Sequence, residues 1–114
     1  MREKAMRKVI LAQLGALHAD AGVELVACKD TCVEDYLTGK ADALAVAMQM
    51  VESKALIETM VSFLREETTR NMNMAESARL CAKDTMARLR EGAAAGYMAA
   101  SRVVTEVREM NKYE

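Results

Sequence analysis

Proline and tryptophan are absent from this 114-residue sequence, and its only aromatic residues are one phenylalanine and three tyrosines. Without proline, the chain lacks the residue that most strongly breaks helices. With so few aromatic rings, its core must be built from aliphatic, methionine and alanine side chains, which suit closely packed helices. We therefore predict an all-α fold.

An excess of charge of either sign is also missing. Sixteen basic and 17 acidic residues give a net charge of −1, so no overall field draws the protein toward nucleic acid or an anionic membrane. The longest stretches without a charged residue, 9–19 and 92–101, are shorter than the roughly 20 residues of a spanning helix. The basic and then apolar N-terminus lacks a small-residue cleavage site. We expect a soluble protein without a membrane partner.

The sequence contains three cysteines, and an odd number in a chain without a recognisable signal peptide does not suggest a disulfide framework. It favours a reducing cytoplasm. Residues 1–114 are enough for one core and too few for two. We therefore expect a single cytoplasmic domain.

Helical periodicity runs through most of the chain. Apolar residues at steps of three and four predict a first helix from about residue 3 to 28, although its continuity through Gly15 and Gly22 stays open. The Thr31–Glu34 segment has the form of a capping box and predicts a short helix to Leu37.

Gly39 is the expected stop of this short helix, because glycine readily adopts the left-handed conformation. A third helix is predicted from about Ala41 to Arg70, and a weaker capping pattern at residues 73–76 marks the next turn. The last helix then runs toward Asn111. The expected fold is an elongated antiparallel bundle of three long helices and one short helix.

Two segments of this bundle carry more apolar surface than three long helices can cover. Residues 43–52 are apolar on two sides, and residues 92–101 have no charge on any side. A helix that is apolar all round is buried all round. We expect a second copy of the chain to supply the missing surface, since two-fold dimers are the commonest oligomers. Alternatively, the short helix or the start of the first helix covers this belt within one chain.

The residues expected at the self-association surface are Leu44, Met48, Val51, Gly92, Ala95, Gly96 and Ala99. Gly92 and Gly96 are one helical turn apart in the longest predicted helix, so they suggest close approach of another backbone. Met72 and Met74, at the predicted turn, are weaker candidates for contact with a different protein.

No arrangement of residues indicates an enzyme, a cofactor or a metal. Phosphate-binding, dinucleotide-binding and hydrolase motifs are absent. His18 is the only histidine, and Cys28, Cys32 and Cys81 do not have the spacing of a zinc site. The roles of the three cysteines are left open. We expect none of these four residues to be a metal ligand.

The sequence thus predicts a non-enzymatic interaction module, such as a small adaptor, chaperone or inhibitor, that self-associates and binds a second protein. One alternative is a nucleic-acid-binding regulator with a basic face on the last helix. Its phosphate contacts would come from Arg79, Lys83, Arg88 and Arg90. A further alternative is a protein that sequesters or senses a nucleotide or metabolite in a pocket between subunits.

Overall fold

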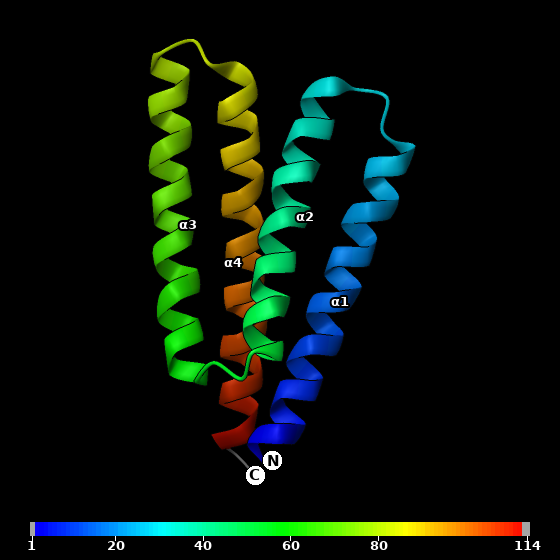
Figure 1. Cartoon of the computed structure of the whole chain (residues 1–114), viewed down its shortest axis with the longest axis vertical. Helices are drawn as coiled ribbons and strands as arrows, with labels where there is room; N and C mark the ends of the chain where they lie inside the picture. The colour runs from blue at the N-terminus through cyan, green and yellow to red at the C-terminus, as the bar shows by residue number, and fades with distance from the viewer. Residues whose placement is uncertain (1, 113–114) are drawn as a thin grey trace.

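A computed structural model describes residues 2–112 of the chain. Four helices follow one another as α1 (Glu3–Ala27), α2 (Thr31–Glu52), α3 (Ile57–Leu80) and α4 (Asp84–Lys112). They alternate in direction, so the described ends of the chain lie at the same end of the bundle (Figure 1). The molecule measures 48 × 29 × 23 Å. The predicted all-α, elongated antiparallel bundle is confirmed.

The predicted division of the first half of the bundle differs from the observed one. The first helix is continuous through Gly15 and Gly22, ending at Ala27. The short helix does not stop at Gly39, because α2 continues through this residue to Glu52. Its N-terminus is capped by Asp30, whose carboxylate accepts hydrogen bonds from the backbone amides of Cys32 (2.8 Å) and Val33 (3.4 Å). The predicted cap, Thr31, is the first helical residue.

The later breaks also lie elsewhere. The predicted third helix is interrupted after Glu52, and α3 continues through the turn predicted from residues 73–76 to Leu80. The observed breaks contain Lys54 and Ala82, which have φ values of 63° and 57°. Both are left-handed positions occupied by residues other than glycine, so the sequence carries no glycine signal at these breaks.

Ala82→Gly should therefore stabilise the fold. A residue with a Cβ atom costs about 1–2 kcal/mol in the left-handed region, and glycine avoids this cost. Glycine also makes the unfolded chain more flexible, which offsets part of the gain in stability. We expect a net gain of about 0.5–1 kcal/mol in the free energy of unfolding, measured with urea. Ala12→Gly, an exposed site inside α1, is the matched control and should lose about 1 kcal/mol. If both substitutions lowered the free energy of unfolding, the left-handed conformation of Ala82 would be contradicted.

α2 and α4 form the centre of the bundle, and α1 and α3 lie on opposite sides of this pair (Figure 1). Glycines allow the two central helices to approach closely. A Cβ atom on Gly39 would overlap the carbonyl group of Leu89, and one on Gly92 would overlap the carbonyl group of Tyr36. One on Gly96 would lie 2.6 Å from the carbonyl oxygen of Lys40. These glycines therefore hold two backbones in contact within one chain.

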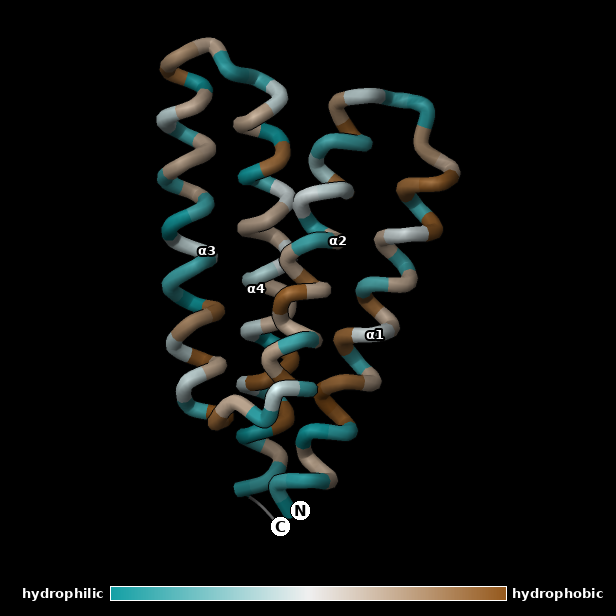
Figure 2. Tube along the Cα trace, viewed as in Figure 1, coloured by the Kyte–Doolittle hydropathy of each residue, from teal (hydrophilic) through white to brown (hydrophobic). Residues whose placement is uncertain are grey.

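The main hydrophobic core fills the end of the bundle near the termini, where all four helices contribute. Hydrophobic segments gather at this end, as Figure 2 shows. Its fully buried members with the largest side chains are Ile10, Leu14, Leu44, Met60, Leu64, Val104 and Val107. The opposite end depends more on small residues and on the glycine contacts between α2 and α4.

Candidate interaction surface

The predicted self-association residues divide into two groups in the structure. The interior group, packed against other parts of the same chain, comprises Leu44, Val51, Gly92 and Gly96. Met48, Ala95 and Ala99 are half-buried. The first half of α2 covers Gly92 and Gly96, which corresponds to the alternative in which the belt is covered within one chain. Self-association itself remains a prediction, and its surface must be sought among residues that still reach solvent.

A groove between α3 and α4 brings together two predicted contact residues that the sequence assigned to different surfaces. Met72 on α3 and Ala95 on α4 both line it. We call this surface the α3–α4 groove, and its volume is about 410 Å³. Its lining consists of Met72, Ala75, Glu76, Arg79, Glu91, Ala94, Ala95 and Met98.

The apolar part of the α3–α4 groove has a shape suited to receiving side chains. Ala75 and Ala94 are almost fully buried, at 4% and 5% exposure. Met72 and Met98 line the same groove and keep 54% and 37% of their surface exposed. Methionine is flexible and polarisable, so it adapts to the shape of a contacting surface. The groove thus offers small residues flanked by two adaptable side chains.

Charged side chains of both signs surround this apolar part. Arg79 of α3 forms an ion pair with Glu91 of α4 across the groove, and Glu76 also lines it. Arg102 contacts the sulfur of Met98 at 3.7 Å. Because these charges include two acids and two bases, two copies of this surface can meet without a net repulsion.

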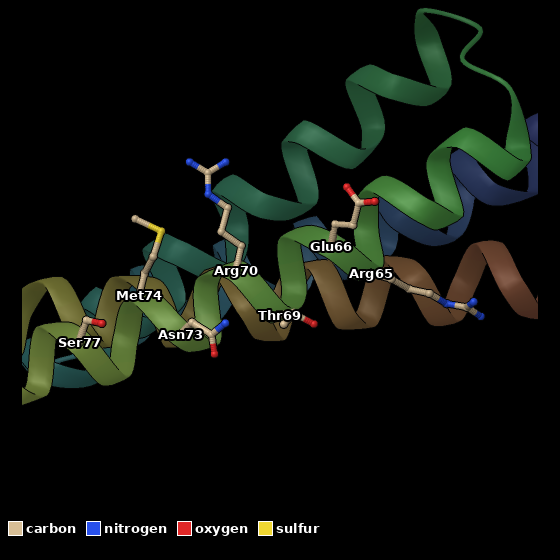
Figure 3. A pocket seen from close by; sticks show the side chains of 7 residues that line it. All are labelled: Arg65, Glu66, Thr69, Arg70, Asn73, Met74 and Ser77. Carbon is tan, nitrogen blue, oxygen red and sulfur yellow. The ribbon is translucent and has the colours of Figure 1, made fainter.

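The outer face of α3 contains the other predicted partner-contact residue, Met74. Arg65, Glu66, Thr69, Arg70, Asn73, Met74 and Ser77 line a shallow surface there. Figure 3 shows that these side chains all come from one helix and point in different directions. They do not converge on a common point, so this face is less suited than the α3–α4 groove to enclosing a partner's side chain. The structure therefore separates Met74 from Met72.

A second apolar surface lies on the outside of α1. Small and aliphatic residues recur along its exposed side, namely Ala12, Ala16, Ala19, Val23 and Val26. By length and composition α1 could also cross a membrane, and both core helices of soluble proteins and N-terminal signal sequences pass the same test. This face is a single helix without a second wall. The α3–α4 groove is therefore the better-formed site.

Three of the four cations proposed for nucleic-acid binding have partners within the protein. Arg79 pairs with Glu91, and Arg88 donates to the carboxylate of Asp35 at 3.0 and 3.2 Å. This hydrogen bond is the main reason that the pKa of Arg88 is raised. Arg90 donates to the side-chain oxygen of Asn71 at 3.3 Å. Lys83 is exposed. Because the three arginines are engaged by partners within the protein, the four residues do not form a continuous cationic face.

The cysteines are distributed over two corners of the bundle. Cys28 is half-buried and Cys32 exposed at the α1–α2 connection, whereas Cys81 is exposed at the α3–α4 connection. His18 lies half-buried on α1. Within residues 2–112, no three histidine, cysteine or acidic side chains are grouped as metal ligands would be.

No protein-family model matches the chain, and no curated protein or solved structure shows significant similarity to it. The sequence pointed to Met72 and Ala95, but it missed Met98 and Glu91. Met98 lies three residues after Ala95, one helical turn along α4, so the two side chains are neighbours on the helix surface. A methionine next to the small residues was the feature of the sequence that could have indicated Met98.

Proposed function

We propose that this chain is a non-enzymatic protein-interaction module that self-associates as a two-fold dimer through the α3–α4 groove. The observation that carries the proposal is this apolar groove, in which exposed Met72 and Met98 flank a surface of buried alanines. Methionine is enriched in the central parts of interfaces, and a polar rim commonly surrounds them. Both features are present on this one surface.

A two-fold arrangement fits the proposal because each copy offers both a projecting and a receiving element. Met98 of one copy would enter the groove of the other, and the same contact would form in reverse. The α1 outer face remains open in such a dimer and is then the surface for a second, different protein. The proposal retains the expectation of a cytoplasmic adaptor, chaperone or inhibitor.

Sedimentation equilibrium of the wild-type protein tests this proposal. The monomer has a mass of 12.6 kDa, so a dimer should approach twice that value as the concentration rises. We expect the transition at concentrations around 1–100 μM, the range of moderately tight complexes. A monomer mass across this whole range would refute self-association.

A further inference from the structure

Met98, which lines the α3–α4 groove, has a cation beside its sulfur atom. A terminal guanidinium nitrogen of Arg102 lies 3.7 Å from this sulfur and donates a hydrogen bond to it. The two residues are four apart on α4, so their side chains are neighbours on the helix surface. Because thioether sulfur is a weak acceptor, the contact adds little to stability while Met98 is reduced.

The guanidinium group of Arg102 is available for a stronger acceptor. Arg102 is exposed, and the ion pairs found among residues 2–112 all use other basic side chains. Its side-chain hydrogen bond within these residues goes to Met98 alone. A more polar group at position 98 would therefore gain this donor without displacing a carboxylate.

Met98 differs in this respect from the other exposed methionines of the described chain, which are Met72, Met86 and Met110. Met86 and Met110 lie outside the α3–α4 groove. Met72 lines it, but within residues 2–112 only Met98 accepts a hydrogen bond at its sulfur. Of these four residues, Met98 alone combines a position in the groove with a cation at the sulfur.

The chemistry of an exposed thioether gives this contact a consequence. Hydrogen peroxide converts methionine to its sulfoxide. The sulfur attacks one peroxide oxygen, an S–O bond forms while the O–O bond breaks, and the second oxygen leaves as water with both protons. Sulfur is thereby oxidised by two electrons and peroxide is reduced. The sulfoxide oxygen is polar and accepts a charge-assisted hydrogen bond from a guanidinium group.

We propose that Met98 and Arg102 form an oxidation switch for the self-association proposed above, on which this inference rests. Reduced Met98 is apolar and enters the groove of the other copy. In the oxidised chain, Arg102 holds the sulfoxide oxygen at the surface of α4, and entering the groove would break this hydrogen bond and bury the polar group. Two-fold symmetry applies the cost twice, so oxidation shifts the equilibrium toward monomers.

Peroxide acts on the monomer, in which 37% of Met98 is exposed, because the proposed interface covers this side chain. Oxidation of Met98 should therefore be slower in concentrated protein than in dilute protein. Met110 is 51% exposed and lies outside the groove, so its oxidation rate should not depend on protein concentration.

Sedimentation equilibrium before and after treatment with hydrogen peroxide tests the proposal, while peptide mass spectrometry locates each added oxygen atom. Cys28, Cys32 and Cys81 are first replaced by serine, so that thiol oxidation cannot link chains. We expect the dissociation constant of this parent protein to rise at least about tenfold on oxidation, because a polar group must be buried. Methionine sulfoxide reductases specific for the two epimers, with dithiothreitol as reductant, should restore the original value.

Three variants of the parent protein assign the effect to the two residues. Met98→Leu is a conservative replacement that has no sulfur to oxidise, so its dissociation constant should change less than about threefold on treatment. Met72→Leu, the matched change on the α3 side of the groove, should stay as sensitive as the parent. Arg102→Gln should show a smaller ratio of oxidised to reduced dissociation constants, because a neutral amide holds the sulfoxide oxygen less strongly.

The untreated parent protein separates this inference from the proposed function. If it sediments as a monomer at all concentrations, self-association and the switch are both refuted. A dimer that persists with Met98 oxidised, a Met98 that resists peroxide in dilute protein, or protection by Met72→Leu in place of Met98→Leu would overturn the switch and leave self-association standing. An unchanged ratio in Arg102→Gln would overturn the role of Arg102.

Discussion

Replacing Gly92 by alanine is expected to lower the free energy of unfolding by about 3 kcal/mol, the upper end of the usual overpacking penalty. The added Cβ would overlap the backbone carbonyl of Tyr36 on α2. A carbonyl group cannot rotate away as a side chain can, so α2 and α4 must separate. Helix propensity favours alanine by about 1 kcal/mol, but this gain is smaller than the loss of close packing.

Chemical unfolding monitored by circular dichroism measures this effect, and the melting temperature should fall by roughly 10 °C. Gly22→Ala is the matched control, because a Cβ at that position of α1 meets nothing within 4 Å. The control should gain about 0.5–1 kcal/mol. If Gly92→Ala were stabilised like Gly22→Ala, the close contact between α2 and α4 would be wrong.

The concentration dependence of this loss separates two explanations for the glycine. If Gly92 served only an interface between copies, the substitution would weaken assembly and leave the monomer's stability unchanged or improved. Because Gly92 packs against α2 in the same chain, we expect the loss of stability to be the same in dilute and concentrated protein.

Ala95→Arg should convert the proposed dimer to a monomer. The substitution introduces a long charged side chain into the α3–α4 groove, and two-fold symmetry introduces it twice. Like charges and lost apolar contact at an interface centre cost several kcal/mol. We expect the dissociation constant to rise at least about 100-fold, which corresponds to about 2.7 kcal/mol.

Sedimentation of Ala95→Arg and of Ala12→Arg tests this expectation. Both alanines lie in helices with part of their surface exposed, and arginine is a good helix former, so both variants should fold. Only Ala95→Arg should sediment as a monomer at concentrations where the wild type is dimeric. Dissociation of Ala12→Arg instead would assign the interface to the outer face of α1.

The sequence was sufficient to predict the fold class, because helical periodicity and the absence of proline extend over nearly the whole chain. It misplaced the breaks, since Gly39 lies inside α2 and the left-handed positions are Lys54 and Ala82. Glycine serves here to bring helices together. A rule that assigns glycine to helix ends therefore placed a stop where the structure has a contact.

The site was only partly predictable for a related reason. An uncharged segment such as 92–101 must be buried, but its periodicity does not say whether a neighbour in the same chain or another copy covers it. The first half of α2 covers one side of this segment through Gly92 and Gly96. An adjoining side, with Ala95 and Met98, forms the α3–α4 groove together with Met72. That pairing depends on how α3 and α4 align, which a single sequence does not specify.

Photo-crosslinking from position 98 tests most directly whether two copies meet through the α3–α4 groove. Met98 is replaced by the photoreactive residue benzoylphenylalanine in isotopically light chains, which are mixed with heavy wild-type chains before irradiation. The account predicts light–heavy products whose crosslinks map to residues 72–98 of the heavy chain. Crosslinks confined to single chains, or light–heavy products that map to the outer face of α1, would contradict it.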